Sequence, residues 1–380
     1  MKNVMERMEE IGAKRKIADF QVKQKLPYEF KIPYAYRRAY EFAEECDKRG
    51  LNCHVSVGGL DSLTLYLWLQ SIGIHVPGIS VSHLEDMSIQ RIHKQIGINH
   101  VPPIKRQDGT YWNKSSVMQE FGFPVISKSK ARKIKCLQVP DNPKQTFIHA
   151  IMTGDMGEQG GYGHSSKLKL PDKWLKLFGG LYQEHRPDML CQAAKFKVSD
   201  RCCYYLKEKP CDDWAKENNS VAYLGLMASE GGQREMGLMK NGCNYFGKST
   251  IRSAPFAIFN RQDLLQLALE LSVPVPEVYG VIKRSEEGLL YTTRAQRTGC
   301  SFCGFGIHLE KRPHRFDRLY QDNPKEWEYW MYRCVTDPET GEQYGWNRVL
   351  DYIGVGWRPE TLEMEIARQK PSKKKKVLVG

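Results

Sequence analysis

Residues 56–62 have the sequence Ser-Val-Gly-Gly-Leu-Asp-Ser, and this stretch decides the fold expected for the chain. The residues before it, 52–57, predict a strand, and residues 62–72 predict an apolar helix that ends at Gly73. Two adjacent glycines let the backbone approach a ligand, because no Cβ atom intrudes. The free N–H groups and positive dipole end of the following helix suit a phosphate. A tight strand-to-helix turn is the alternative reason for two glycines.

The same alternation of strand and helix continues outward from this loop. Residues 76–81 predict a second strand, and residues 88–96 predict a second helix. Further along, residues 221–227 predict a buried strand, and Asn260 is placed as the N-cap of an apolar helix with Asp263 at the third position. This alternation predicts an α/β fold with a parallel sheet.

The N-terminal part of the chain is charged and has helical spacing. Residues 1–33 predict a helical lead-in that breaks at Pro27 and Pro33, and residues 34–48 predict a separate helix.

The chain is basic, with 57 Lys and Arg against 44 Asp and Glu and a net charge of +13. The lysine run at 373–376 accounts for only part of this excess, so the body of the protein is basic as well. Such a surface suits a nucleotide or nucleic acid, although it also serves solubility. No apolar run approaches the roughly 18 residues of a membrane helix, and residues 1–16 lack the apolar core of a signal peptide. We therefore expect a cytoplasmic protein without a membrane partner.

The chain has 11 cysteines, which in the cytoplasm are not expected to form a disulfide framework. Cys202 and Cys203 are adjacent, and Cys300 and Cys303 form a Cys-x-x-Cys motif. Four thiolates are what a [4Fe–4S] cluster or a structural zinc ion requires. Buried free thiols are the alternative that needs no metal.

The glycine loop resembles the pyrophosphate loop, Ser-Gly-Gly-x-Asp-Ser, of the adenine nucleotide α-hydrolase-like superfamily. That superfamily includes ATP pyrophosphatases and phosphoadenylyl-sulfate (PAPS) reductases. Val57 replaces the first serine of the loop, and Ser56 precedes it. The resemblance implies a Rossmann-like, parallel-sheet α/β fold that binds ATP or another adenine nucleotide, with Mg²⁺ as a candidate metal. The implied nucleotide-binding residues are Ser56, Gly58, Gly59, Asp61, Ser62 and Lys207.

The segment 202–210, a Cys-Cys pair followed by Lys-x-x-Pro, resembles the PAPS reductase family. In the iron–sulfur subset of that family, such a pair and a distant Cys-x-x-Cys together hold one [4Fe–4S] cluster. The resemblance therefore implies that Cys202, Cys203, Cys300 and Cys303 are the cluster ligands, and it favours iron over zinc.

Residues 224–234 resemble the family's Gly-x-Arg-x-x-Glu-Ser-x-x-Arg strand and loop, with Met227 in place of the first arginine. Glu230 and Arg234 are retained just after the end of a predicted strand, where α/β proteins bind ligands. A surface ion pair of little energetic effect is the alternative. Together with Asp61 and Ser62, these two residues form the predicted catalytic set.

A PAPS or adenylyl-sulfate reductase carries its nucleophilic cysteine in a C-terminal Glu-Cys-Gly-type motif, which this sequence lacks. Cys334 is the only cysteine after Cys303. The chain is more similar to the sulfur-transfer enzyme of DNA phosphorothioation, which implies ATP-dependent, pyrophosphate-releasing sulfur transfer to a nucleic acid or nucleotide. A cysteine desulfurase or thioredoxin-like protein is the implied sulfur donor. The alternatives are a sulfonucleotide reductase that uses Cys334 and a non-catalytic nucleotide-binding module.

The segment 311–318 is basic and directly follows the Cys-x-x-Cys motif. Its arginines predict contacts with the phosphate backbone of DNA or RNA, although a solvated basic helix end is an equal alternative. The residues concerned are Arg312, Arg315 and Arg318.

These motifs suggest a division of the chain. We expect a helical lead-in, a PAPS reductase-like nucleotide-binding domain, an aromatic and basic C-terminal region, and a lysine-rich tail. An irregular or helical insertion is expected at about 105–200. The expected bounds of the four parts are 1–49, 50–310, 311–370 and 371–380.

Overall fold

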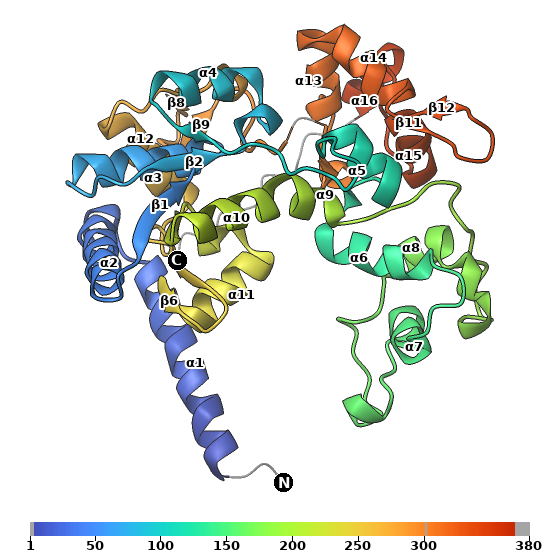
Figure 1. The fold of residues 1–380 in the computed structure, drawn as a ribbon, viewed down its shortest axis with the longest axis horizontal. Coiled ribbons are helices and arrows are strands. Elements are labelled where there is room, and N and C mark those ends of the chain that lie inside the picture. The colour runs from blue at the N-terminus through green and yellow to red at the C-terminus, as the bar shows by residue number, and fades with distance from the viewer. Residues whose placement is uncertain (1–3, 301, 369–380) are drawn as a thin grey trace. The chain divides into compact units, whose positions relative to one another are not determined.

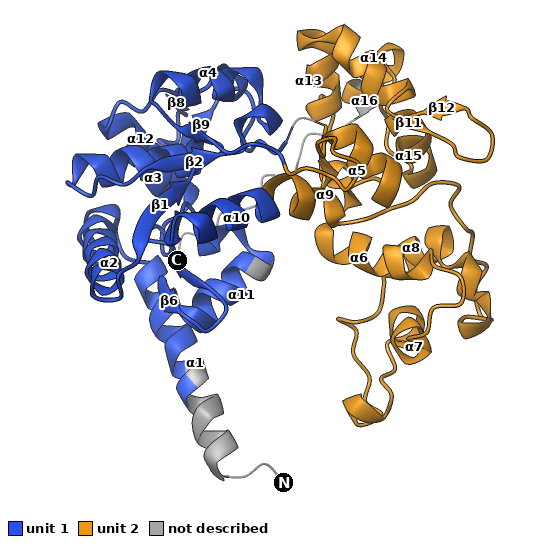
Figure 2. Ribbon diagram, viewed as in Figure 1, with its two compact units in different colours: residues 1–103, 208–301 blue, residues 104–207, 302–380 orange. Residues whose placement is uncertain are grey.

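The structure, a computed structural model, describes residues 4–300 and 302–368. It divides into two compact units (Figure 2). Unit 1 combines residues 1–103 with 208–301, and unit 2 combines residues 104–207 with 302–380. The predicted lead-in thus belongs to unit 1, and the predicted insertion shares unit 2 with the C-terminal region. The predicted lysine-rich tail lies outside the described residues.

Unit 1 is built on a six-stranded sheet with the order β3-β2-β1-β5-β7-β6. Figure 1 labels β1, β2 and β6 of this sheet. Neighbouring strands from β3 to β7 pair in parallel, and β6 is antiparallel to β7. A mixed α/β fold with a mostly parallel sheet is therefore confirmed. The strands are β1 (Asn52–Ser56), β2 (Gly78–Ser80), β3 (Asn99–His100), β5 (Ser220–Leu224), β6 (Asn244–Phe246) and β7 (Ile251–Ser253).

The direction of the chain across the sheet reverses between β1 and β5. These strands pair in register from Asn52 with Ser220 to Ser56 with Leu224. From β1 the chain proceeds through β2 to β3 on one side, whereas β5 leads to β7 on the other. In open α/β sheets, ligands bind outside the carboxyl ends of the strands at such a point. The glycine loop directly follows β1 and therefore lies at this position.

Helices cover the sheet and bury its apolar side chains. The first turn of α3 follows the glycine loop, and α12 packs against α3. The N-cap predicted at Asn260 is confirmed. It is part of a capping box, since the Asn260 side chain accepts from the backbone of Asp263 and the Asp263 side chain accepts from the backbone of Asn260. The helices of unit 1 are α1 (Val4–Gln24), α2 (Tyr28–Lys48), α3 (Leu60–Ser71), α4 (Met87–Gln95), α10 (Lys209–Glu217), α11 (Gly232–Asn241) and α12 (Arg261–Glu270).

The helix break predicted at Pro33 is wrong, because α2 begins at Tyr28 and continues through this proline. Pro33 removes only one helical hydrogen bond, near the start of the helix. The buried Lys31 ammonium lies 2.7 Å from Asp263 Oδ2. This ion pair joins the first turn of α2 to the first turn of α12. This tertiary contact and the buried Ala35 and Ala39 favour one continuous helix.

Unit 2 consists mainly of helices packed around one hydrophobic core. Its core joins residues that are distant in the sequence, including Phe123, Phe178, Phe316 and Trp346. Parallel β4 (Val125–Ile126) and β10 (Gly304–Phe305) link its two chain segments, and β11 (Val335–Thr336) pairs with β12 (Gln343–Tyr344). Its α-helices are α5 (Lys114–Phe121), α6 (Lys128–Leu137), α7 (Gln145–Thr153), α8 (Asp172–Phe178), α9 (Arg201–Cys203), α13 (Arg315–Asp322), α14 (Pro324–Tyr332), α15 (Trp346–Ile353) and α16 (Leu362–Arg368).

Unit 1 also contains a hairpin of two strands, β8 (Ile282–Arg284) and β9 (Leu290–Thr292). Its short 3-10 helices are η1 (Ser82–Leu84), η5 (Ala228–Glu230) and η6 (Glu277–Tyr279). Across the described residues, we find no helix with the length and apolar character needed to cross a membrane.

The backbone at Gly225 lies directly against the first turn of α3. A Cβ atom there would lie 2.8 Å from Ser62 Cα and 2.9 Å from Ser62 N. Gly225→Ala should therefore lower the free energy of unfolding by about 1–3 kcal/mol, since neither backbone can move freely. Gly237→Ala is the matched control: outside its own helix backbone, no atom of the described residues lies within 4 Å of its Cβ position, so this change in α11 should stabilise by up to about 1 kcal/mol. Urea denaturation of both variants measures the difference. Equal stability of the two variants would contradict this close packing.

Candidate functional site

The glycine loop is held in shape by its own hydrogen bonds. The Ser62 hydroxyl accepts from the backbone N–H of Gly58 at 2.7 Å and donates to the carbonyl of Gly59 at 3.0 Å. From α4, the buried His93 ring places Nε2 2.9 Å from the Gly58 carbonyl. Ser62, predicted to bind nucleotide, therefore also closes the loop.

Two residues from the end of unit 1 cover the loop. The Leu60 N–H donates to the Tyr279 hydroxyl at 3.1 Å, and this hydroxyl lies 2.7 Å from Thr298 Oγ1. A Cβ atom at Gly59 would lie 2.2 Å from the Tyr279 hydroxyl and 3.0 Å from Thr298 Oγ1. This packing alone favours glycine at position 59, because a larger residue would displace Tyr279 or Thr298.

Asp61, in the first turn of α3, forms an ion pair with Arg261, the first residue of α12. The distance between Asp61 Oδ1 and Arg261 Nη1 is 2.6 Å, and each side chain is 27% exposed. Burial raises the pKa of Asp61 above its ordinary value, even though the positive charge of Arg261 opposes the shift. The pair therefore holds a carboxylate that is partly desolvated at the carboxyl edge of the sheet.

Arg261 also has unused hydrogen-bond donors. Its Nε and Nη2 atoms are buried, and no group among the described residues accepts a hydrogen bond from either. Buried polar groups are nearly always satisfied, and an unpaired buried donor costs roughly 1–3 kcal/mol. A guanidinium with two such donors suits a bidentate acceptor, and phosphate is one. Because Arg261 also lies beside the N-terminus of α3, this part of unit 1 can bind an anion.

Glu230 and Arg234 lie together, as part of the predicted catalytic set. The Glu230 side chain is only 4% exposed, and its carboxylate lies 2.5 Å from Arg234 Nη1 and 3.5 Å from Arg297 Nη2. The negative charge of Glu230 contributes to the raised pKa of Asp61, and Arg297 acts in the opposite direction. These two carboxylates and their arginines therefore form one electrostatically coupled group within unit 1.

Two other residues predicted to bind nucleotide, Ser56 and Lys207, lie outside the loop at 58–62. Ser56 is the last residue of β1, in register with Ile79 and Leu224. Lys207 lies in a π-helical turn, Tyr204–Glu208, and belongs to unit 2 rather than to the unit that holds the loop.

Sequence reasoning missed several residues of this site. Arg261 follows the Asn260 cap that the sequence did identify, and this cap was the available signal. Nothing in the local sequence distinguishes the others from ordinary polar residues. The missed residues are His93, Gly225, Arg261, Tyr279, Arg297 and Thr298.

The two cysteine-bearing segments of unit 2 are joined to the same short stretch of backbone, residues 123–126. On one side, the Phe123 N–H donates to the Lys197 carbonyl at 2.8 Å, just before Cys202 and Cys203. On the other side, β4 pairs with β10, which begins directly after Cys303. Adjacent strands are separated by about 4.8 Å, so the backbone brings both segments into one neighbourhood.

The fourth predicted ligand, Cys300, lies on the other side of the boundary between the units. All four thiols are partly exposed rather than buried in a core, which suits thiolate ligands. Among the described residues, no three His, Cys, Asp or Glu side chains are gathered as a metal site would require.

Comparison with known proteins adds no relative. No family model, curated protein or solved structure matches the chain.

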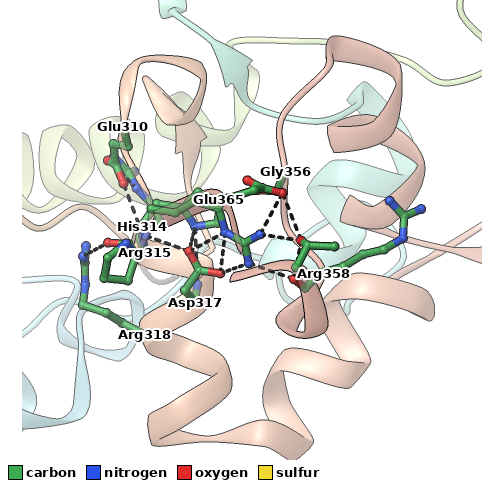
Figure 3. A network of polar contacts seen from close by, with 11 residues as sticks. Glu310, His314, Arg315, Asp317, Arg318, Gly356, Arg358 and Glu365 are labelled. Carbon is green, nitrogen blue, oxygen red and sulfur yellow. Dashed lines mark hydrogen bonds and ion pairs between the residues drawn. The ribbon is translucent and has the colours of Figure 1, made fainter. Parts of the chain in front are cut away.

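The prediction that Arg312 contacts nucleic acid is wrong, because this side chain is only 4% exposed. Figure 3 shows the polar network around Asp317, its ion-pair partner. Arg312 donates to both carboxylate oxygens of Asp317, with Nη2 2.5 Å from Oδ1. It also donates to the Thr361 hydroxyl and to the Arg358 carbonyl, and it pairs with Glu365 at 3.3 Å. Arg312 therefore ties α13 to the C-terminal helical segment.

The other two arginines of the basic segment are partly exposed. Arg315 pairs with Glu310 and donates from Nη1 to the Cys303 carbonyl at 2.8 Å. Arg318 donates to the Pro313 carbonyl at 3.1 Å. Arg315 thus braces the backbone of the Cys-x-x-Cys motif, and only its remaining exposed surface and Arg318 are left as candidates for a phosphate contact.

Cys334, the alternative nucleophile, is buried and 3% exposed. Its thiol donates to the Trp330 carbonyl at 3.3 Å, and burial raises its pKa to about 12. A thiol attacks as the thiolate, so this environment argues against Cys334 as a nucleophile.

Replacing Arg312 by methionine should destabilise the protein strongly. The change leaves the buried Asp317 carboxylate with His314 but without its guanidinium partner, and breaking such a buried ion pair costs about 3–5 kcal/mol. The exposed neighbour provides the control, since Lys311→Ala should change stability by less than about 0.5 kcal/mol. Urea denaturation followed by tryptophan fluorescence measures both. If the Arg312→Met protein were as stable as wild type and bound nucleic acid more weakly, Arg312 would be a nucleic-acid contact after all.

The same network predicts a loss of stability in acid. Burial alone would raise the pKa of Asp317, but hydrogen bonds with His314 and Arg312 outweigh it and lower this pKa to about 2. Since the pKa is lower in the folded state, the contribution is complete above about pH 4 and disappears as the pH falls towards 2. At neutral pH it amounts to roughly 2 kcal/mol. Asp317→Asn should therefore differ most from wild type above pH 4 and least at pH 2, which acid titration of the unfolding free energy tests.

Proposed function

We propose that unit 1 binds an adenine nucleotide, with the phosphates on the loop at 58–62, and that the chain is a PAPS reductase-like iron–sulfur enzyme. The observation that carries the proposal is that two donor atoms of Arg261 are buried and have no acceptor among the described residues. Arg261 is paired with Asp61 in the first turn of α3, where the direction of the chain across the sheet reverses between β1 and β5. Adenine is the expected base because the loop sequence resembles that of the adenine nucleotide α-hydrolase-like superfamily.

The proposed reaction is ATP-dependent sulfur transfer with release of pyrophosphate. An oxygen of the substrate attacks the α-phosphorus of ATP, the bond between the α- and β-phosphates breaks, and a sulfur nucleophile then displaces AMP. Arg261 and the positive end of α3 are suited to stabilise the negative charge that develops on pyrophosphate. Asp61 is suited to hold Mg²⁺, since a bound cation favours its ionised form despite the raised pKa.

Glu230 and its arginines are proposed to orient the substrate. The buried carboxylate fixes Arg234 and Arg297, whose side chains are 55% and 61% exposed. Each guanidinium therefore keeps donors on the solvent side that can bind an anionic group.

Cys202, Cys203, Cys300 and Cys303 are proposed to hold a [4Fe–4S] cluster. When bound, such a cluster supplies one-electron redox chemistry at a thiolate-ligated iron centre. The contact between Arg315 and the Cys303 carbonyl fixes the backbone beside one of these ligands. The burial of Cys334 argues against the sulfonucleotide reductase alternative. A nucleic-acid acceptor is proposed from the basic charge of the chain and from Arg318, without Arg312.

Replacing Arg261 by methionine should weaken ATP binding by at least about tenfold, because two charge-assisted hydrogen bonds are lost. Gly59→Val should abolish it, because the larger side chain collides with Tyr279 and Thr298 and displaces the loop. The control is Arg91→Met, since Arg91 forms an exposed ion pair with Glu277 and should leave ATP affinity unchanged. Calorimetry with ATP and Mg²⁺ measures all three variants. Unchanged affinity in Arg261→Met would remove the main support for the site.

The products then distinguish the three functions. Pyrophosphate release from ATP with a sulfur donor and nucleic acid supports sulfur transfer. Sulfite formation from PAPS with thioredoxin would instead show a reductase. Nucleotide binding without turnover would show a binding module.

Protein purified without oxygen should contain about four iron and four sulfide per chain, with broad absorbance near 400 nm. Serine at position 202, 203, 300 or 303 should lower the iron content, whereas Cys136→Ser, at another partly exposed cysteine, should not. Iron and sulfide analysis measures this. Stoichiometric zinc without iron would contradict the cluster.

A further inference from the structure

A cavity of about 310 Å³ lies in unit 1 and shares no residue with the glycine loop. It is lined by four residues of α1, by two residues of α2, and by the stretch 239–244 that runs from the end of α11 to the start of β6. The α1 and α2 residues are Lys16, Asp19, Phe20, Lys23, Tyr34 and Arg38. Ligand pockets begin at about this size, which suits a compact molecule rather than a polymer.

The lining of the cavity is strongly cationic. Lys16, Lys23, Arg38 and Lys240 line it, against a single carboxylate, Asp19. A concave surface of one charge sign concentrates ligands of the opposite sign. The side chain of Asn241, a neutral polar residue of the lining, can add a hydrogen bond to an anion.

Arg38 is oriented by contacts on its other sides. Its guanidinium pairs with Glu41 at 2.9 Å, and its backbone carbonyl accepts from Asn244 Nδ2 at 2.8 Å. Its Nε atom is buried, and no acceptor for it exists among the described residues. An unsatisfied buried guanidinium donor in a cationic cavity indicates an anionic acceptor.

Tyr34, the tyrosine that lines the cavity, is not available to stack on an aromatic base. Lys23 and Arg38 lie over its ring, at 5.7 and 5.4 Å from the centroid. Its hydroxyl lies 3.5 Å from Cys243 Sγ. Both the ring and the hydroxyl are therefore in use, and the ring serves to hold two cations at the cavity.

From this geometry we infer that the cavity binds a small phosphorylated anion, at a site separate from the proposed nucleotide loop. The phosphate contacts Arg38 and Lys240, and the other two lysines add to the potential. Binding joins α1 to the end of α11, because the cavity lies between them.

The test uses two full-length proteins: Gly59→Val, in which we expect binding at the loop to be lost, and wild type, which shows whether a missing signal in Gly59→Val reflects misfolding. Calorimetry at low salt with inorganic pyrophosphate and with inorganic phosphate should still detect binding. The double change Arg38→Gln and Lys240→Gln should weaken it by at least about tenfold. Lys240→Gln alone, at an exposed position, should weaken it measurably without affecting the fold. Lys48→Gln, an exposed lysine outside the cavity, should have no effect.

Hydrogen exchange provides a second measurement that needs no variant of the cavity. Bound pyrophosphate should slow amide exchange in residues 16–24 of the Gly59→Val protein. Two results would overturn the inference: no binding of either anion to Gly59→Val at millimolar concentration, or equal affinity in the Arg38→Gln and Lys240→Gln protein. Since the Gly59→Val protein is used throughout, failure here leaves the proposed nucleotide site untouched.

Discussion

The ion pair between Asp61 and Arg261 is the interaction on which the proposed site depends. It joins the first turn of α3 to the first turn of α12, across 200 residues of sequence. Each partner is fixed by a local device: Asp61 by the hydrogen-bonded glycine loop, and Arg261 by the Asn260 capping box. One end of the guanidinium is used for structure, and two buried donors remain for a ligand.

An arginine–aspartate ion pair has a different role in unit 2. There, Arg312 and Asp317 are almost completely buried, and the guanidinium uses its donors on the carboxylate, a hydroxyl and a backbone carbonyl. A buried arginine whose donors are all matched stabilises the fold, whereas one with unmatched donors indicates a ligand. Arg261 and Arg38 have buried donors without an acceptor among the described residues and are the two arginines that we propose as binding residues, whereas the donors of Arg312 serve the fold.

The features predicted correctly from the sequence are local ones. The strand at 52–56, the helix after the glycine loop and the Asn260 cap follow from spacing and from side chains a few residues apart. Arg261, Tyr279 and Arg297 join the loop through tertiary contacts, which a local pattern does not contain. Arg312 was misassigned for the same reason, because charge along a segment does not reveal burial. At Pro33, the tertiary ion pair between Lys31 and Asp263 outweighs the local signal for a break.

The most direct test is an experimental structure of the protein with a non-hydrolysable ATP analogue and Mg²⁺. The account predicts phosphate oxygens within about 3 Å of Arg261 Nε and Nη2, with the pyrophosphate against the first turn of α3. A nucleotide bound elsewhere, with Arg261 still paired only with Asp61, would contradict it.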